Sequence, residues 1–172
     1  VGLSRIVALR SSGTGVNDLM TSTDGDTWTI GSTSMPLNWT SVTFGGGVFV
    51  AVADGDGNFP FTTSGGDQVI TSTSDDLIFN MGSRVMTSYD GLTWTLRTAP
   101  VYAWSSVTYG NNLFVAVANG NGGSTQVMTS SNGITWTLRS TPFSQSNHNW
   151  RSVVYGDGTY VAVASGGSGT LN

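Results

Sequence analysis

The chain of 172 residues contains no cysteine, no lysine and no glutamate. The absence of cysteine excludes disulfides, thiolate metal sites and a cysteine nucleophile. Lysine and glutamate are strong helix formers, whereas the threonine, valine and aromatic residues that the chain does contain favour strands. The composition therefore predicts an all-β fold.

Charged side chains are also few, since six arginines and ten aspartates make up 9% of the chain and give a net charge of −4. Nucleic-acid affinity depends largely on clustered basic residues, and the chain has no basic run, so we expect no nucleic-acid partner. No apolar run approaches the roughly 20 residues that span a bilayer, so we expect no membrane insertion. No basic region precedes an apolar stretch at the N-terminus, so any signal peptide is expected to be absent or already removed.

Two strand-like segments recur three times along the sequence. The first begins with tryptophan and lies at 39–45 (WTSVTFG), 104–110 (WSSVTYG) and 150–156 (WRSVVYG). The second follows after a short Gly-rich or Asn-rich turn and lies at 49–53 (FVAVA), 114–118 (FVAVA) and 160–164 (YVAVA). Both faces of this second segment are apolar, which predicts a strand buried deeply between neighbouring sheets.

A third repeated segment predicts hairpins. It lies at 19–28 (LMTSTDGDTW), 85–94 (VMTSYDGLTW) and 127–136 (VMTSSNGITW). Asp-Gly or Asn-Gly between two β-rich runs is a strong signal for a two-residue turn in which both central residues have positive φ. The strand after the turn alternates polar and apolar residues, as in Thr93, Trp94, Thr95 and Leu96. Such alternation predicts an outer edge strand with one covered face.

Together these segments predict the fold class and its divisions. Trp104 and Trp150 are 46 residues apart, and four antiparallel strands in about this length is typical of a β-propeller blade. We predict about three blades of four antiparallel strands, with incomplete first and last blades; a sandwich or a solenoid is the alternative. The predicted single repeat domain, 1–172, comprises a partial blade 1–31, a blade 39–97 with an insertion 54–83, a blade 104–139 and a partial blade 150–172.

The hairpins resemble the Asp-box, or bacterial neuraminidase repeat, whose pattern is Ser-x-Asp-x-Gly-x-Thr-Trp between the third and fourth strands of a blade. Here Gly follows Asp directly and the third copy has Asn, which resembles the compact variant of sialidase-like and photosystem-assembly-factor-like propellers. The resemblance implies that the box is a folding device, in which Asp or Asn binds turn amides, Gly has positive φ and Trp packs into the blade. The matching residues are Ser22, Asp24, Gly25, Thr27 and Trp28, then Ser88, Asp90, Gly91, Thr93 and Trp94, then Ser130, Asn132, Gly133, Thr135 and Trp136.

The catalytic residues that the sialidase resemblance implies are missing. That active site resembles an arginine triad with an acid and a Tyr–Glu nucleophile pair, and this chain has no glutamate. Arg97 and Arg139 occupy equivalent positions of the repeat, which favours a surface role for both. Glycosidases in general need two carboxylates at a defined separation, and the spacing of the aspartates defines no such pair. We predict that the chain is not an enzyme.

The insertion 54–83 is the largest departure from the repeat. Insertions in repeat arrays usually lie in exposed loops, which often bind ligands; a decorative hairpin is the alternative. Its first oxygen-bearing side chains, Asp54, Asp56 and Asn58, alternate as in the first half of a calcium loop. Phe59 stands where that pattern has glycine, and no glutamate is available to complete it. The interpretations are therefore a weak calcium site, with no other cofactor, or a set of turn residues.

Aromatic residues outside the repeat are the candidates for ligand binding. They are Phe59, Phe61, Phe143 and His148. Exposed rings beside Asn, Asp and Ser suit a sugar, so a glycan-binding propeller is the alternative function. His148 is the sole histidine, which excludes a histidine cluster for a metal, and we expect it to be a solvated loop residue.

The remaining class of function is a structural or adhesive module. The predicted strand at 6–9 corresponds to the second repeated segment, and the sequence ends just past another copy of that segment, at 160–164. The terminal blades are therefore expected to lack strands. Unpaired strand edges associate readily, and three blades are too few for a ring of the usual four to eight. We therefore predict a non-catalytic repeat module whose partners are copies of itself or further blades of a longer chain. Its surface, rich in Ser, Thr, Gly and Asn without lysine, suits the outside of a cell or virion.

Overall fold

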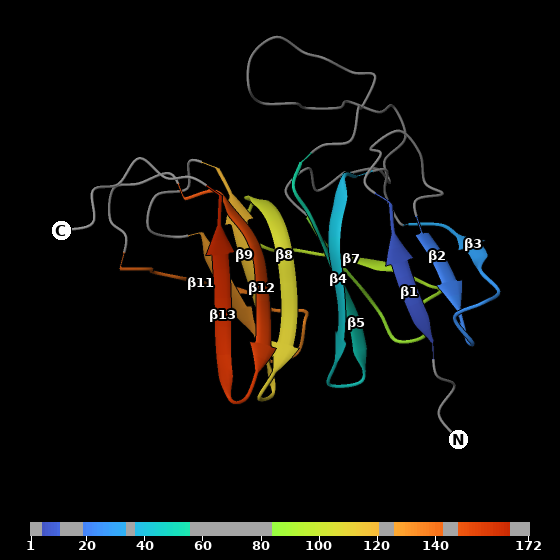
Figure 1. Ribbon diagram of the computed structural model, residues 1–172. Helices are drawn as coiled ribbons and strands as arrows, with labels where there is room; N and C mark the ends of the chain where they lie inside the picture. Colours follow the sequence, from blue (N-terminus) through green and yellow to red (C-terminus); the bar gives the residue numbers. More distant parts are fainter. Residues whose placement is uncertain are drawn as a thin grey trace, which may run out of the picture.

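The computed structural model describes residues 5–10, 19–33, 37–55, 84–120, 126–142 and 148–165. These residues form thirteen strands and no helix, so no helix among them could cross a membrane. The strands make four antiparallel sheets (Figure 1). Sheet 1 contains β1 (Ile6–Leu9), β2 (Leu19–Ser22) and β3 (Thr29–Gly31); sheet 2 contains β4 (Trp39–Gly45), β5 (Val48–Ala53), β6 (Val85–Ser88) and β7 (Thr95–Arg97). Sheet 3 contains β8 (Ala103–Gly110), β9 (Leu113–Asn119), β10 (Val127–Ser130) and β11 (Thr137–Arg139); sheet 4 contains β12 (Trp150–Gly156) and β13 (Thr159–Ala164).

Within each sheet, neighbouring strands follow one another in the sequence. Sheets 2 and 3 have the four strands of a propeller blade. Among the described residues, sheet 1 has three strands that correspond to the second, third and fourth of sheet 2, and sheet 4 has two that correspond to the first and second. The predicted fold class is confirmed: all-β, with four-stranded antiparallel blades and open first and last sheets.

The tight turns lie between the first and second strands of sheets 2, 3 and 4. Two residues separate the last paired positions, and both have positive φ, as a type I′ hairpin requires. These residues are Gly46 and Gly47, Asn111 and Asn112, and Asp157 and Gly158.

The hairpins that carry Asp-Gly or Asn-Gly are different from the two-residue turn predicted for them. The pairing of β2 with β3 ends at Thr21 and Thr29, so residues 22–28 form a longer loop, and the other two hairpins match it. Among the loop residues only Gly25, Gly91 and Gly133 have positive φ. The two-residue prediction is wrong because serine and aspartate side chains, rather than a tight backbone turn, satisfy the loop amides, as described below.

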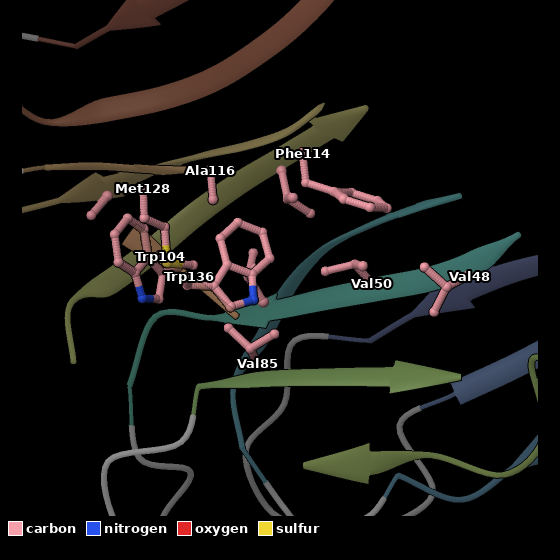
Figure 2. Packing of buried hydrophobic residues seen from close by; sticks show 11 residues of the cluster. Val48, Val50, Val85, Trp104, Phe114, Ala116, Met128 and Trp136 are labelled. Carbon is pink, nitrogen blue, oxygen red and sulfur yellow. The ribbon is translucent and has the colours of Figure 1, made fainter. Parts of the chain in front are cut away.

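The sheets stack face to face, with apolar layers between them. We call the face of a sheet toward the next sheet in the sequence its forward face, and the opposite face its backward face. The layer between sheets 1 and 2 includes Val7, Leu9 and Leu19 against Trp39, Phe49, Ala51, Met86 and Trp94. The next layer has Val48, Val50, Val52 and Val85 against Trp104, Phe114, Ala116, Met128 and Trp136 (Figure 2). The last has Val115 and Val117 against Trp150, Val153 and Tyr160.

Burial of the second strand differs from one sheet to the next. All six residues of β5 are buried, as the sequence predicts. In β13, however, Val161 is 53% exposed and Val163 is 55% exposed. The prediction of deep burial is therefore wrong for β13, because no described sheet covers the forward face of sheet 4.

Candidate functional site

The first Asp-Gly hairpin is closed by two side chains. The Ser22 hydroxyl donates to Asp24 Oδ1 at 2.9 Å and accepts from the Gly25 amide at 2.8 Å. Asp24 Oδ1 also accepts from the amides of Asp26 and Thr27, at 2.9 Å each. The longer loop leaves backbone amides without strand partners, and these side-chain oxygens accept hydrogen bonds from them. The longer loop is therefore stable.

The other two hairpins repeat this arrangement. Asp90 Oδ1 accepts from the Leu92 and Thr93 amides at 2.8 Å each, and Asn132 Oδ1 accepts from its two equivalents at 2.9 Å each. An amide oxygen therefore does the same work as a carboxylate. This equivalence favours a structural role for the hairpin over an acid or base.

Folding nevertheless lowers the pKa of both carboxylates, Asp24 and Asp90. Hydrogen bonds from the Thr93 and Leu92 amides and from Ser88 lower the pKa of Asp90 to about 2, and the Thr27 and Asp26 amides lower the pKa of Asp24. A lowered folded pKa stabilises the protein above the unfolded value near 3.8, and this contribution is lost as the pH falls toward about 2.

We expect Asp90→Asn to flatten the acid limb of stability. An asparagine can accept the same two amide bonds as Asn132 but does not titrate, so the wild-type melting temperature should fall more steeply than that of the variant between about pH 4 and pH 2. Thermal unfolding across this range measures the difference. Asn132→Asp is the matched control and should steepen the same limb; parallel acid limbs in all three proteins would contradict the assignment.

The hairpin tryptophan joins the loop to the core. Its indole Nε1 donates to the glycine carbonyl of the same loop, at 3.0 Å from Trp28 to Gly25 and 3.0 Å from Trp136 to Gly133. Trp94 and Trp136 are 8% exposed, but Trp28 is 38% exposed. Trp28 differs because the backward face of sheet 1 has no described sheet against it.

The hairpin glycines are also contact points between sheets. A β-carbon on Gly133 would lie 2.7 Å from Cγ2 of Val50 in the preceding sheet. A β-carbon on Gly91 would lie 3.1 Å from Cγ2 of the equivalent valine, Val7, and 2.6 Å from Arg5 Cδ. Real β-carbons essentially never come closer than 3.0 Å to another heavy atom, so glycine lets each hairpin lie directly against the preceding sheet.

A second set of contacts links the first strands of neighbouring sheets. Hydroxyl groups beside the repeated tryptophan, where each strand has a register shift, bond to the next sheet. Sequence reasoning missed these hydroxyls, although their recurrence one and two residues after both Trp39 and Trp104 was a usable signal. The bonds run from Thr40 Oγ1 to the Trp104 carbonyl and from Ser105 Oγ to the Trp150 carbonyl, each 2.7 Å, and from the Val107 amide to Ser41 Oγ at 3.2 Å and the Val153 amide to Ser106 Oγ at 3.1 Å.

Tyrosine rings lie on glycines at the ends of these strands. A β-carbon on Gly45 would lie 2.0 Å from the Tyr109 ring of sheet 3, and one on Gly110 would lie 2.1 Å from the Tyr155 ring of sheet 4. The equivalent glycine of sheet 4 is Gly156, and no described atom lies within 4 Å of a β-carbon placed on it. A tyrosine ring therefore covers two of the three equivalent glycines, and among the described residues no ring covers the third, Gly156.

Sheets 1 and 4 lie at opposite ends of the stack (Figure 1), and the outward face of each carries exposed apolar side chains. The backward face of sheet 1 carries Ile6 (45% exposed), Met20 (42%), Trp28 (38%) and Ile30 (74%). The forward face of sheet 4 carries Val154 (57%), Val161 (53%) and Val163 (55%). Contiguous apolar surface of this kind is typical of interaction sites.

The sequence-predicted ligand residues are only partly described. Phe59, Phe61 and Phe143 lie outside the described residues. His148 is half-buried, and its ring stacks on Trp150 with centroids 5.7 Å apart and an angle of 21° between the planes. This stacking joins His148 to the repeat, which its isolated position in the sequence does not indicate.

Of the three predicted calcium ligands only Asp54 is described, because Asp56 and Asn58 lie outside the described residues. Asp54 Oδ1 accepts a hydrogen bond of 2.6 Å from Asn38 Nδ2. In the part of the chain that the structure describes, no three acidic, histidine or cysteine side chains come together as metal ligands. Calcium binding stays a prediction.

The two repeated arginines make equivalent contacts across the outer pair of strands. Arg97 Nε donates to Thr87 Oγ1 at 2.8 Å, and Arg139 Nε donates to Thr129 Oγ1 at 2.9 Å. Both bonds join the third and fourth strands of a sheet. The two side chains therefore support the sheet edge in the same way in sheets 2 and 3.

Comparison with known proteins adds little. No protein-family model and no curated protein matches the sequence. A solved structure titled "YCF48 bound to D1 peptide" matches with 16% identity and a TM-score of 0.32, over 88% of this chain and 60% of that chain. This chain thus spans less than two thirds of the length of that one, and a likeness at this level assigns neither a family nor an activity.

Proposed function

We propose that this chain is a non-catalytic structural repeat module that associates with other copies of itself through its two exposed sheet faces. The observation that carries the proposal is the concentration of large exposed apolar side chains on the backward face of sheet 1 and the forward face of sheet 4. Burial of apolar surface is the main favourable contribution to most protein–protein association. The residues equivalent to Ile6, Met20 and Trp28 in sheet 2, and to Val161 and Val163 in sheets 2 and 3, are buried between sheets.

The hairpins support the assignment of the repeat as an Asp-box. Serine, aspartate or asparagine, and glycine make one hydrogen-bond pattern in all three loops, and the tryptophan bonds back to the glycine carbonyl. The aspartate oxygens are engaged by turn amides, which supports a structural rather than a catalytic box. We place the module on the outside of a cell or virion, for which its polar surface without lysine is suited.

The first test is the mass of the chain by light scattering across a dilution series. We expect discrete dimers or larger assemblies at micromolar concentration that dissociate on dilution, because association through a sheet face obeys mass action. Circular dichroism at each concentration should show unchanged strand content. A well-folded monomer across the whole range would overturn the proposal.

A glycan-binding role is the second candidate, and the half-buried ring pair of His148 and Trp150 favours it. Sugars stack on aromatic rings and bond to neighbouring polar groups. A glycan array should then show selective binding that His148→Ala reduces. Absence of selective binding would contradict the glycan-binding role, and self-association would then be the one remaining proposal.

A further inference from the structure

We propose that copies join head to tail, with the forward face of sheet 4 of one copy against the backward face of sheet 1 of the next. In this contact Val161 of the first copy lies on Gly25 of the second. The inference rests on the proposed self-association and specifies its partner and register.

The chain already forms this contact twice within itself. Val7 of sheet 1 lies against the hairpin glycine of sheet 2, Gly91, and Val50 of sheet 2 lies against the hairpin glycine of sheet 3, Gly133. The equivalent valine on sheet 4 is Val161, which is 53% exposed. The equivalent glycine on sheet 1 is Gly25, where the nearest atom to a β-carbon is Ile6 Cδ1 of its own sheet, at 3.7 Å. The open valine and the open glycine are thus the two halves of one recurring contact.

The side chains around the open glycine match those of a closed contact. Strand pairing makes Ile6 equivalent to Phe49, and Met20 equivalent to Met86. Phe49 and Met86 are 8% and 0% exposed beneath sheet 1, whereas Ile6 and Met20 are 45% and 42% exposed. The backward face of sheet 1 therefore carries apolar side chains at the positions that are buried in sheets 2 and 3, but no described sheet covers them.

The same holds around the open valine. Val163 on β13 is equivalent to Val52 and Val117, which are 0% and 1% exposed between sheets, while Val163 is 55% exposed. Two valines two residues apart on one strand face lie against the next sheet in the layer between sheets 2 and 3 and in the layer between sheets 3 and 4. Sheet 4 thus offers the surface on which a following sheet of this same repeat fits.

The occupant that fits best is a second copy, because a single chain presents both complementary halves. The two faces are different, with larger side chains on sheet 1 and valines on sheet 4, so the contact is heterologous. Heterologous contacts repeat from copy to copy, and they form a closed ring or an open filament according to the rotation between copies.

The decisive experiment blocks each face separately and then mixes the two variants. Val161→Asp introduces a charge on the forward face and Ile30→Asp on the backward face; both residues are exposed in the single chain, so both variants should fold. Burying an unpaired carboxylate is strongly unfavourable. Each variant alone should need a concentration higher by about 100-fold or more to assemble, as measured by light scattering.

An equal mixture of the two variants should give a discrete dimer. The Ile30→Asp copy keeps an intact forward face and the Val161→Asp copy keeps an intact backward face, so one contact forms and growth stops there. Val101→Asp is the matched control, because Val101 is 53% exposed but lies outside both faces, and it should assemble like the wild type.

The outcomes separate the two proposals. If the wild type is monomeric, self-association itself fails, and the head-to-tail contact with it. If the wild type assembles and both variants assemble equally well, association is real but uses other surfaces. If only one variant is impaired, copies meet through like faces, and the head-to-tail register is overturned while self-association stands.

Discussion

Gly110→Ala should destabilise the chain strongly, whereas Gly156→Ala should have almost no effect. The two glycines end equivalent strands, β8 and β12, just before equivalent two-residue turns. A β-carbon on Gly110 would lie 2.1 Å from Cγ and Cδ1 of Tyr155, close to the backbone end of the ring rather than at a flexible tip. Relief requires displacement of the ring or of the strand, and overpacking of this kind costs about 1–3 kcal/mol or more.

Gly156→Ala is a close control because the backbone context is the same and neither glycine has positive φ. With open space around its β-carbon, the substitution should be neutral or stabilising by up to about 1 kcal/mol through the unfolded chain. Chemical denaturation at low protein concentration measures both values. Equal effects of the two substitutions would mean that the tyrosine ring is not seated on Gly110.

Strand positions were predictable because the chain marks them with repeated local signals. The segment expected at 39–45 is β4, Trp39–Gly45, and the segment expected at 150–156 is β12, Trp150–Gly156. Each is followed directly by a residue with positive φ, Gly46 after β4 and Asp157 after β12. Repetition inside one chain thus provided the evidence that a single copy would have lacked.

The hairpin loop was mispredicted because its conformation depends on side chains rather than on local φ preferences alone. Asp24 and Gly25 are the residues of a two-residue turn, and sequence statistics favour that turn. The Ser22 hydroxyl, however, bonds to the Gly25 amide and to the Asp24 carboxylate. A hydrogen bond from a residue two or three positions earlier is what lengthens the loop.

Exposure of the outer faces could not be predicted from local sequence. Val161 and Val50 lie in nearly identical segments, YVAVA and FVAVA, yet one is 53% exposed and the other is 0% exposed. Their burial depends on whether another sheet lies against them, and that is a property of the stack. Local composition therefore indicated Phe59, Phe143 and the calcium loop as candidates, whereas only the incomplete terminal blades of the repeat indicated association through the ends of the stack.

Trp136→Ala should cost about 3–5 kcal/mol, the usual range for removal of a buried tryptophan, and Trp28→Ala should cost much less at low concentration. The two residues hold the same position in their hairpins and make the same Nε1 bond of 3.0 Å to a glycine carbonyl, so that bond cancels in the comparison. Trp136 is 8% exposed in the layer between sheets 2 and 3 (Figure 2), whereas Trp28 is 38% exposed. More of the Trp28 ring is already in water, and its removal leaves no closed cavity.

The comparison should depend on protein concentration if copies join head to tail. Where the wild type assembles, Trp28 becomes covered by the forward face of sheet 4 of another copy, and any contact that favours the folded state raises its apparent stability by mass action. The cost of Trp28→Ala should then rise with concentration toward that of Trp136→Ala, while the cost of Trp136→Ala stays closer to constant. Urea denaturation at two protein concentrations, one below and one above assembly, measures both. A Trp28→Ala cost that is small and equal at the two concentrations would show that the backward face of sheet 1 stays open to solvent in the assembly.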